Sequence, residues 1–420
     1  MNVNIFPDGY LPPEIRGKEI KEVKELNSRH SPEDSLELLF YLKTQGDLEE
    51  TALRLARDET TGKWIGKGEP TSLFKKSMAD VDKIFILEKG EGIVSIRTPL
   101  INISPEDPLY QILMLAVGGP VLEFVYYERV TLLDINLPPS LLKRFPGPSF
   151  GIFGVRKLLN LPPSHPILGT IIKPCAGLTP EEVADKCYQA VKGGVRFIKD
   201  DEKMLGPAYA PPEKKIKLVS QALQKAYEET GVKCIYAPHL VGRADKLVDI
   251  ARRYIEWGAT GLMLNVVLGH TPEVLKILRE HPEINVPLYA HSGGRSGLST
   301  GPRRIEDGVI VKLIRLCGGD FFQHGVFGVR DCHVASLDEN LLHHLVYTMR
   351  QEIPGIKDTI PVAAGGLGKE TLKRNLTEHY HPQFGYGVAL LAGTGLLGDP
   401  EGPESGGRKM REIIEEFLTS

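Results

Sequence analysis

Short hydrophobic segments alternate with amphipathic, helix-forming segments from about residue 146 to the end of the chain. Eight of the hydrophobic segments are expected to form strands: residues 168–174, 196–202, 234–240, 261–268, 286–292, 321–327, 360–366 and 387–395. A regular alternation of strand and helix is typical of βα units with a parallel sheet. Eight such units in roughly 250 residues predict a TIM (β/α)8 barrel.

Helix boundary signals support this interpretation. Thr179 is followed by a proline and two acidic residues, which is the pattern of a helix start, and the glycines at 193–194 are a helix stop. A doubly wound open sheet is the competing architecture. It needs a glycine-rich phosphate turn after its first strand, whereas this chain has the sequence KPCAG at residues 173–177.

The first 145 residues follow a different pattern. A helical pattern over residues 31–58 precedes alternating segments at 83–87 and 92–96 and a further segment at 121–133. Together they predict a small α+β (ferredoxin-like) domain with one sheet and one helix layer. Proline-rich sequence at 137–148 marks the crossing to the barrel, so we expect two domains, residues 1–145 and 146–420.

Composition narrows the classes of function. The net charge of −3 offers no basic surface for nucleic acid. The five cysteines are scattered without C-x-x-C spacing, which indicates reduced thiols rather than disulfides or zinc. The N-terminus has no signal pattern, and no run approaches the roughly 18 apolar residues of a membrane span. We therefore expect a cytoplasmic protein that binds neither nucleic acid nor membranes.

The sequence FIKDDE at residues 197–202 places a lysine and three carboxylates at the end of an apolar strand. Side chains alternate along a strand, so Lys199 and Asp201 project the same way and Glu202 can turn in beside them. Carboxylate oxygens suit a hard ion such as Mg²⁺. Lys199 fits such a site after reaction with CO₂, because a lysyl carbamate offers oxygen ligands. A simple Lys–Asp ion pair is the alternative.

Polar residues recur where the predicted strands end, which is the rim that carries the chemistry in TIM barrels. The rim positions are Lys173, Lys199, Asp201, Glu202, His239, Asn265, His291, Gln323, His324, Gly365, Gly366, Gly393, Thr394 and Gly395. A single histidine at a strand end is more often a structural hydrogen-bonding group than a catalyst. The paired glycines could present backbone N–H groups to a phosphate, although a glycine pair alone usually marks a turn.

From about residue 35 to residue 418 the chain resembles the large-subunit family of ribulose bisphosphate carboxylase (RuBisCO). The resemblance rests on motifs that follow the family's order and spacing: TGKW at 61–64, GTIIKP at 169–174, FIKDDE at 197–202, AH at 290–291, GGD at 318–320, GG at 365–366 and GTGLLGDP at 393–400. It implies that Lys199 is carbamylated by CO₂ and that Asp201 and Glu202 are the other Mg²⁺ ligands.

The same resemblance implies roles for further residues. Lys173 would be the acid/base beside the enediolate carbons, and as a base it would need a lowered pKa. His291 would contact a substrate hydroxyl or carry a proton. One phosphate would be bound by Lys63, Trp64, Gly365, Gly366, Gly393 and Gly395. In the family, small-domain residues complete the active site of a neighbouring subunit, so we expect a homodimer or a higher oligomer of dimers.

Several positions depart from the carboxylase pattern. A lysine, an arginine, a histidine, a serine and an asparagine of the carboxylases are replaced by Cys175, Ser292, Gln323, Ala364 and Gly119, respectively. The loop lysine that positions CO₂ in the carboxylases has no clear counterpart, and Val329 or Arg330 is nearest to its position. The replacements at Ser292, Gln323 and Ala364 remove the second phosphate pocket of the carboxylases, which Arg295 is the one cation that could restore. The chain therefore looks like the RuBisCO-like, type IV, branch, which does not fix CO₂.

These features leave three functions open. The first is a Mg²⁺-dependent lyase or decarboxylase of a 3-oxo sugar acid, with or without a phosphate, which local similarity over 169–177 and 197–204 favours slightly. The second is an enolase or isomerase of a ketose 1-phosphate, of the 2,3-diketo-5-methylthiopentyl-1-phosphate type in methionine salvage. The third is a non-catalytic binding or regulatory protein, which would have no need for Lys173, Lys199 and His291 together.

Overall fold

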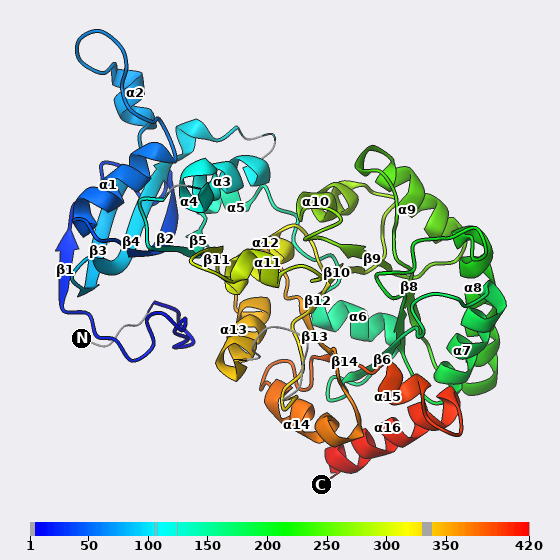
Figure 1. The fold of residues 1–420 in the computed structure, drawn as a ribbon. Helices are drawn as coiled ribbons and strands as arrows, with labels where there is room; N and C mark the ends of the chain where they lie inside the picture. The colour runs from blue at the N-terminus through cyan, green and yellow to red at the C-terminus, as the bar shows by residue number, and fades with distance from the viewer. Residues whose placement is uncertain (1–4, 105, 107, 124, 330–337, 420) are drawn as a thin grey trace. The chain divides into compact units, whose positions relative to one another are not determined.

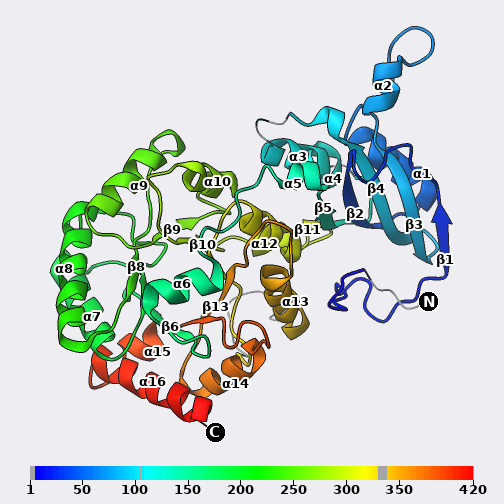
Figure 2. The ribbon, with the colours of Figure 1, turned by 180° about the vertical axis from the view of Figure 1, so that it is seen from behind.

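The computed structural model describes residues 5–104, 106, 108–123, 125–329 and 338–419. The chain divides into two compact units, which Figures 1 and 2 show from opposite sides. The first unit is Met1–Phe145 together with Arg295–Ile310, and the second is Pro146–Gly294 together with Val311–Ser420. Among the helices in these described ranges, none has both the length and the apolar character needed to cross a membrane.

The first unit is a mixed sheet with strand order β1-β3-β4-β2-β5-β11. The strands are β1 (Glu22–Glu25), β2 (Ser35–Lys43), β3 (Asp80–Glu88), β4 (Glu91–Pro99), β5 (Arg129–Asn136) and β11 (Arg303–Ile305), and only β5 and β11 pair in parallel. Its helices are α1 (Leu48–Asp58), α2 (Ser72–Ser77), α3 (Pro108–Val117), α4 (Gly119–Glu123), α5 (Pro139–Leu142) and α11 (Ser296–Ser299), with the short η1 (Leu100–Asn102). Helix α1 begins after Asp47, whose side chain accepts a hydrogen bond from the Glu50 amide.

Two sequence-based expectations for this unit are wrong in detail. The expected helix over residues 31–58 is a strand, β2, followed by helix α1. Strand β2 lies between β4 and β5 and buries one face, formed by Leu36, Leu38, Phe40 and Leu42. Leu39 and Tyr41 add apolar residues to the other, partly exposed face, so the apolar residues run together over 38–42 and the strand alternation is hard to recognise. The expected segment at 121–133 divides between helix α4 and strand β5.

The second unit is the TIM-like barrel predicted from the sequence. Its sheet has the order β8-β7-β6-β14-β13-β12-β10-β9, entirely parallel. The strands are β6 (Ile167–Ile171), β7 (Phe197–Lys199), β8 (Ile235–Ala237), β9 (Leu262–Asn265), β10 (Leu288–His291), β12 (Phe321–Gln323), β13 (Ile360–Ala364) and β14 (Ala389–Leu391). Backbone bonds join the segment after β8 to β9, with the Leu240 amide donating to the Met263 carbonyl at 2.8 Å, so the barrel is nearly closed. All eight predicted strands overlap observed ones.

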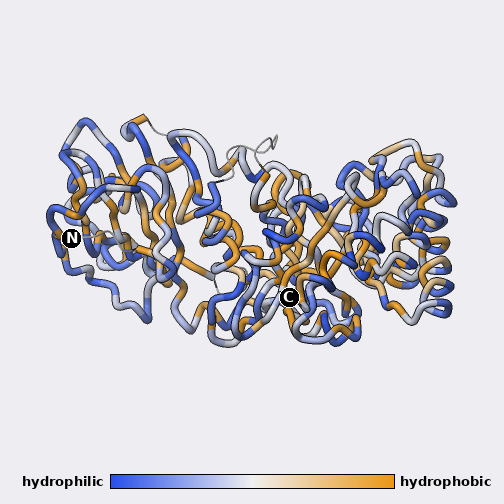
Figure 3. The backbone as a smooth tube through the Cα atoms, turned by 90° about the horizontal axis from the view of Figure 1, so that it is seen from below, coloured by the Kyte–Doolittle hydropathy of each residue, from blue (hydrophilic) through white to orange (hydrophobic). Residues whose placement is uncertain are grey.

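Helices surround the barrel, except that α6 lies within the ring that the others form, as Figure 1 shows. They are α6 (Gly151–Leu159), α7 (Pro180–Lys192), α8 (Pro212–Thr230), α9 (Leu247–Glu256), α10 (Glu273–Glu280), α12 (Asp307–Leu316), α13 (Glu339–Arg350), α14 (Lys369–His379), α15 (Thr394–Leu397) and α16 (Pro403–Thr419), with the short η2 (Ala244–Lys246). Thr179 and Glu182 form a capping box at the start of α7, and Gly193 caps its end, as the sequence predicts. The turns of the helices alternate between hydrophilic and hydrophobic colours along the tube in Figure 3.

Large side chains fill the barrel interior. The rings of Phe197 and Phe321 lie 4.7 Å apart, and Tyr289 stacks against both. Ile152 and Leu159 of helix α6 belong to the same buried cluster. Because side chains alternate along a strand, Lys199 points the same way as Phe197, and His291 the same way as Tyr289, one step closer to the carboxyl end.

Candidate active site

The predicted catalytic and metal-binding residues lie at the carboxyl ends of three barrel strands. Strands β6 and β7 are neighbours, and β10 lies across the barrel from them. Lys199 is the last residue of β7 and His291 the last of β10. Lys173 follows β6 after one intervening residue, Asp201 follows β7 in the same way, and Glu202 comes directly after Asp201. The carboxyl ends of parallel barrel strands meet at one rim, so the side chains converge there.

Lys199 is fully buried in the barrel interior. Its Nζ donates to the Asp200 carbonyl at 3.0 Å, lies 3.4 Å from the Met263 sulfur and is 5.4 Å from the centre of the Tyr289 ring. Burial lowers the pKa of Lys199 to about 8. The neighbouring acids oppose this effect and raise the pKa, and Glu202 does so most strongly. At pH 7 roughly a tenth of this amine is therefore neutral, against about one part in a few thousand for an ordinary lysine. CO₂ reacts with the neutral form.

Lys173 contacts Asp201 directly. Its Nζ lies 2.5 Å from Asp201 Oδ2 and 3.3 Å from the sulfur of Cys175. Burial, the largest single influence, lowers the pKa of Lys173, but the hydrogen bonds and charges of Asp201 and Cys175 together outweigh burial and raise it. The lowered pKa expected for a base at this position is therefore not observed. The same contact holds the pKa of the Asp201 carboxyl below its usual range, although burial opposes it.

His291 faces Glu202. Its Nε2 lies 3.4 Å from Glu202 Oε2, and its Nδ1 accepts a hydrogen bond from the Gly293 amide at 3.1 Å. Since Nδ1 is an acceptor, the proton of the neutral ring is on Nε2, directed at Glu202. Burial, reinforced by the charge of Lys199, lowers the pKa of His291 to about 3. The ring is thus a neutral hydrogen-bonding group at physiological pH.

Asp200, the third carboxylate of the motif, faces away from this cluster. It accepts hydrogen bonds from the Lys215 ammonium, from the Tyr236 hydroxyl at 2.9 Å and from the His239 amide at 3.1 Å. These three partners of the carboxylate come from β8, the segment after it and helix α8. Asp200 therefore fixes the backbone that carries Lys199 and Asp201, and it is unsuited to be a metal ligand.

The donor set around Lys199 fits Mg²⁺. Without a carbamate the set is incomplete: within the described parts of the chain, no cluster of three or more His, Cys, Asp or Glu side chains could hold a metal ion. Asp201 and Glu202 supply two carboxylates, and both act electrostatically on Lys199. A carbamate on Lys199 would complete an all-oxygen set, and the lowered pKa of the amine favours its formation.

The predicted phosphate-binding glycines form adjoining turns at the ends of β13 and β14. Gly365 and Gly366 have φ angles of +94° and +98°, which side chains rarely adopt. A Cβ on Gly395 would lie 2.9 Å from the Leu367 carbonyl, and one on Gly393 would lie 3.5 Å from the Lys173 side chain. The glycines thus allow these two turns to approach each other and Lys173 closely.

Lys63 and Trp64 lie in the first unit, between helices α1 and α2. Lys63 is exposed. The Trp64 indole donates to the Gly68 carbonyl at 3.0 Å, and its ring meets Phe74 edge-on with centroids 5.0 Å apart. Trp64 therefore folds over its own loop within this unit.

Other polar residues of the rim have structural partners. Asn265 accepts hydrogen bonds from the amides of Val267 and Leu268 and so orders the turn after β9. Gln323 accepts from the Tyr289 hydroxyl at 2.9 Å. His324 Nε2 lies 2.8 Å from His379 Nε2 on helix α14, and the two rings stack.

Arg295, a further cation considered from the sequence, does not join this cluster. Arg295 is buried and pairs with Asp307, with 3.3 Å between Nε and Oδ1, and it belongs to the first unit. Arg330 lies outside the described residues. Val329 lies beside Gly366, since a Cβ on Gly366 would lie 3.4 Å from a methyl carbon of Val329.

His239, whose role the sequence left open, is buried at the end of β8. Burial lowers its pKa to about 4, so the ring is neutral. Its Nδ1 has no hydrogen-bond partner among the described residues.

Sequence reasoning missed the residues that surround Lys199. Met263 and Tyr289 contact its ammonium, and Lys215 anchors the neighbouring Asp200. Met263 and Tyr289 occupy ordinary apolar strand positions, and their only signal is the alternation that places them inside the barrel. Lys215 lies on helix α8 within a lysine-rich segment that resembles a solvated face.

Comparisons with known proteins agree with this geometry. Residues 151–419 match the family described as ribulose bisphosphate carboxylase large chain, catalytic domain. A 2,3-diketo-5-methylthiopentyl-1-phosphate enolase of Bacillus velezensis is 30% identical over 390 residues, covering 91% of this chain and 92% of the relative. A ribulose bisphosphate carboxylase of Methanosarcina mazei is 27% identical over 398 residues, covering 89% and 87%.

Solved structures show the same similarity. A rubisco-like protein of Alicyclobacillus acidocaldarius superposes with a TM-score of 0.80 at 28% identity, covering 92% of this chain and 94% of that one. An octameric ribulose-1,5-bisphosphate carboxylase/oxygenase of Pyrococcus horikoshii shares the fold, with a TM-score of 0.84 at 24% identity and coverage of 93% and 89%. The chain therefore belongs to the ribulose bisphosphate carboxylase large-chain family, and its similarity to an enolase and a rubisco-like protein is consistent with the RuBisCO-like, type IV, branch.

Proposed function

We propose that this chain is a Mg²⁺-dependent enzyme that forms an enediolate from a carbonyl substrate and does not fix CO₂. The observation that carries the proposal is the convergence of Lys173, Asp201, Glu202 and His291 on the buried, low-pKa Lys199 at one barrel rim. A protein without catalytic activity would have no physical reason to bury a lysine among these groups.

In this proposal carbamylated Lys199, Asp201 and Glu202 hold Mg²⁺. The ion would supply Lewis-acid stabilisation of the negative charge that develops on adjacent substrate oxygens. His291, neutral because of its burial, would hydrogen-bond a substrate hydroxyl. Lys173 is 34% exposed, so its ammonium can reach the reacting atoms.

The raised pKa of Lys173 favours a proton-donating role for its ammonium. Proton abstraction then falls to a carbamate oxygen on Lys199 or to Lys173 after the Asp201 contact loosens. Decarboxylation needs no base in its first step, only stabilisation of the resulting enolate and a later proton donor. The same residues therefore serve either reaction.

The phosphate of a substrate would be bound by Gly365, Gly366, Gly393 and Gly395, with Lys63 and Trp64 assigned by the family resemblance. Backbone N–H groups at glycine turns before helices α14 and α15 suit an anion. A sugar acid or sugar monophosphate is the substrate class that fits one such pocket.

Two reactions remain candidates. Enolisation or isomerisation of a ketose 1-phosphate is supported by the 30% identity to a diketo-phosphate enolase. Decarboxylation of a 3-oxo sugar acid is supported by the similarity of residues 169–177 and 197–204 to the sugar-acid branch of the RuBisCO-like proteins. It is also supported because the loss of CO₂ needs no base. Their products differ, so a substrate panel separates them.

The test is hydrogen exchange with Mg²⁺ in deuterated water over keto acids and ketose phosphates. We expect deuterium beside the carbonyl, or CO₂ released from a 3-oxo acid, and no label from ¹⁴C-bicarbonate in an acid-stable product. Lys173→Met should keep Mg²⁺ binding but lose exchange, while Lys203→Met, at an exposed lysine nearby, should keep both. Stable ¹⁴C incorporation at a rate comparable to exchange would return the chain to the carboxylases.

A further inference from the structure

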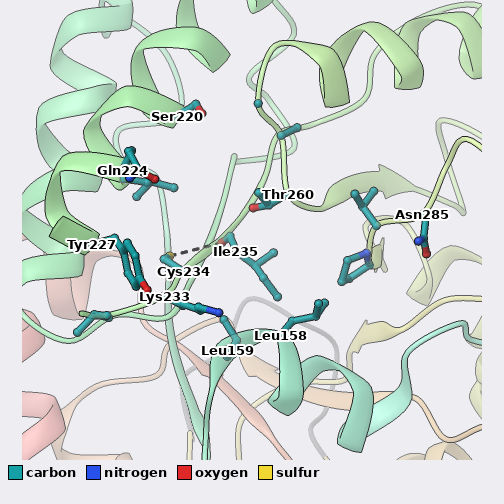
Figure 4. A pocket seen from close by; sticks show the side chains of 16 residues that line it. Leu158, Leu159, Ser220, Gln224, Tyr227, Lys233, Cys234, Ile235, Thr260 and Asn285 are labelled. Atoms are coloured by element: carbon teal, nitrogen blue, oxygen red, sulfur yellow. Dashed lines mark hydrogen bonds between the residues drawn. The ribbon is translucent and has the colours of Figure 1, made fainter. Parts of the chain in front are cut away.

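A cavity lies at the opposite end of the barrel from the candidate active site. Its volume is about 510 Å³. Its walls come from the residues that precede β8, β9 and β10 and from helices α6 and α8. Figure 4 shows Ser220, Gln224 and Tyr227 following one another along helix α8, with Leu158 and Leu159 on helix α6. Because the rim residues follow the strands and these residues precede them, the two sites are distinct.

One wall of this amino-terminal cavity is apolar. Leu158 and Leu159 of α6, Leu223 of α8, and Val286 and Pro287 before β10 line it. The volume falls within the roughly 300–1,000 Å³ that is usual for small-molecule sites. The cavity can therefore hold an apolar body of metabolite size.

The charge of the lining is positive. Lys233 is its one cationic residue, and none of the lining residues is acidic. Cys234 stays a neutral thiol, because burial raises its pKa. Arg196, whose charge acts on Cys234, lies just behind the wall and donates from Nη1 to the Leu159 carbonyl at 3.1 Å.

Lys233 has no carboxylate within ion-pair distance among the residues that the structure describes. Nearby helix ends, which carry partial negative charge, already have partners. The Tyr227 carbonyl accepts from the Gly231 amide at 2.7 Å, and the Arg253 carbonyl accepts from the Trp257 amide at 2.9 Å. The charge of Lys233 is thus available to a ligand.

We propose that this cavity binds a small amphipathic anion, an aromatic or branched apolar body carrying one carboxylate or sulfonate. The acid would pair with Lys233 and the body would pack against Leu158, Leu159 and Leu223. This inference is independent of the proposed reaction, since it uses none of the rim residues.

The test uses the fluorescent anion 8-anilinonaphthalene-1-sulfonate and its neutral analogue N-phenyl-1-naphthylamine on the full-length protein. We expect one saturable site per chain for both probes. Lys233→Met should weaken binding of the sulfonate about tenfold, which is about 1.4 kcal/mol, and change binding of the neutral probe less than twofold. Lys225→Met, on α8 but outside the lining, is the matched control and should bind both probes like the wild type.

Gln224→Trp should abolish binding of both probes, because a large ring from this exposed helix position fills the cavity. Circular dichroism establishes that the variant folds, and if it does not, Lys233→Met decides alone. Failure of either probe to saturate, or sulfonate binding unchanged in Lys233→Met, would overturn the proposal. Binding that is lost in Lys173→Met but kept in Gln224→Trp would place the probe at the rim and would also overturn it.

Discussion

Two lysines of the candidate active site show how position in the barrel sets side-chain chemistry. Lys199 stands inside the barrel, where burial lowers its pKa to about 8 and makes the amine available to CO₂. Lys173 stands at the edge of the rim, where burial lowers the pKa less than the hydrogen bonds and charges of Asp201 and Cys175 together raise it, so the ammonium stays charged. The same residue type thus suits a carbamate ligand at one position and a proton donor at the other.

At this scale we predict activation by bicarbonate and Mg²⁺ together. Preincubation with both should raise activity, because the neutral amine of Lys199 must become a carbamate before it can join an oxygen ligand set. ¹³C-bicarbonate should give a carbamate resonance that is absent in Lys199→Ala and present in Lys203→Ala. Activity that is insensitive to both additions, with no such resonance, would contradict the site.

A second residue-scale prediction concerns phosphate number. Ser292, Gln323 and Ala364 carry no charge, and Arg295 is paired with Asp307, so none of these four described positions offers an unpaired cation to a second phosphate. A monophosphate or free sugar acid should therefore bind at least about tenfold more tightly than ribulose bisphosphate, since a charged hydrogen bond contributes about 1.5–3 kcal/mol. Calorimetry measures this, and tight bisphosphate binding would refute it.

The monophosphate pocket can be tested separately at Gly366. A side chain there is strained at a φ of +98° by about 1–3 kcal/mol. Gly366→Ala should weaken monophosphate binding while leaving a free sugar acid unaffected.

At the scale of the element, the sequence predicts the barrel well because its strands are buried apolar runs separated by clear helix signals. All eight were found, and so was the capping box of α7. Strand β2 was missed because Leu39 and Tyr41, on its partly exposed face, are apolar and so obscure the alternation that identifies a strand. Partners distant in sequence were also invisible: nothing near His324 indicates that it pairs with His379 on α14.

An element-scale prediction concerns the contact between helices α1 and α4. Glu59 follows α1, and its buried carboxylate accepts a hydrogen bond from the Val121 amide of α4 at 2.7 Å. Burial, opposed by backbone hydrogen bonds, raises the pKa of Glu59 to about 7. The folded-state pKa of Glu59 exceeds its unfolded value. The stability that this group contributes is therefore fully present below about pH 4.5 and is lost as the pH rises through 7.

The free energy of unfolding of the first unit should therefore fall by about 2–3 kcal/mol between pH 5 and pH 8 because of this group. Glu59→Gln should remove that part of the pH dependence, whereas Glu50→Gln, at an exposed position on the same helix, should retain it. Urea denaturation at the two pH values measures the difference. Equal pH dependence in the wild type and Glu59→Gln would contradict the assignment.

At the scale of the whole molecule, the two units are not simply consecutive in sequence. Arg295–Ile310 belongs to the first unit although barrel sequence flanks it on both sides. Arg303–Ile305 adds strand β11 beside β5, and Arg304 pairs with Glu14 and Glu306. The sequence shows no change of composition at this segment. Its place in the first unit depends on partners from the distant N-terminal part of the chain, so it could not be predicted from the local sequence.

The last prediction is the assembly. Tyr110 and Met114 lie four residues apart on helix α3 and are 60% and 49% exposed, and exposed apolar side chains that share a helix face are typical of interaction surfaces. With the family resemblance, they support an obligate homodimer, or a higher oligomer of dimers. Light scattering should give twice the 46.4 kDa of the chain, or an even multiple.

Replacement of both apolar residues, Tyr110→Lys with Met114→Lys, should shift the mass to that of one chain and remove most activity. Tyr380→Lys, at an exposed tyrosine of the second unit, should change neither. Loss of activity on dilution should follow the same dissociation curve as the mass, because the site is expected to need two copies. A fully active monomer would refute the obligate dimer and leave each barrel rim sufficient by itself.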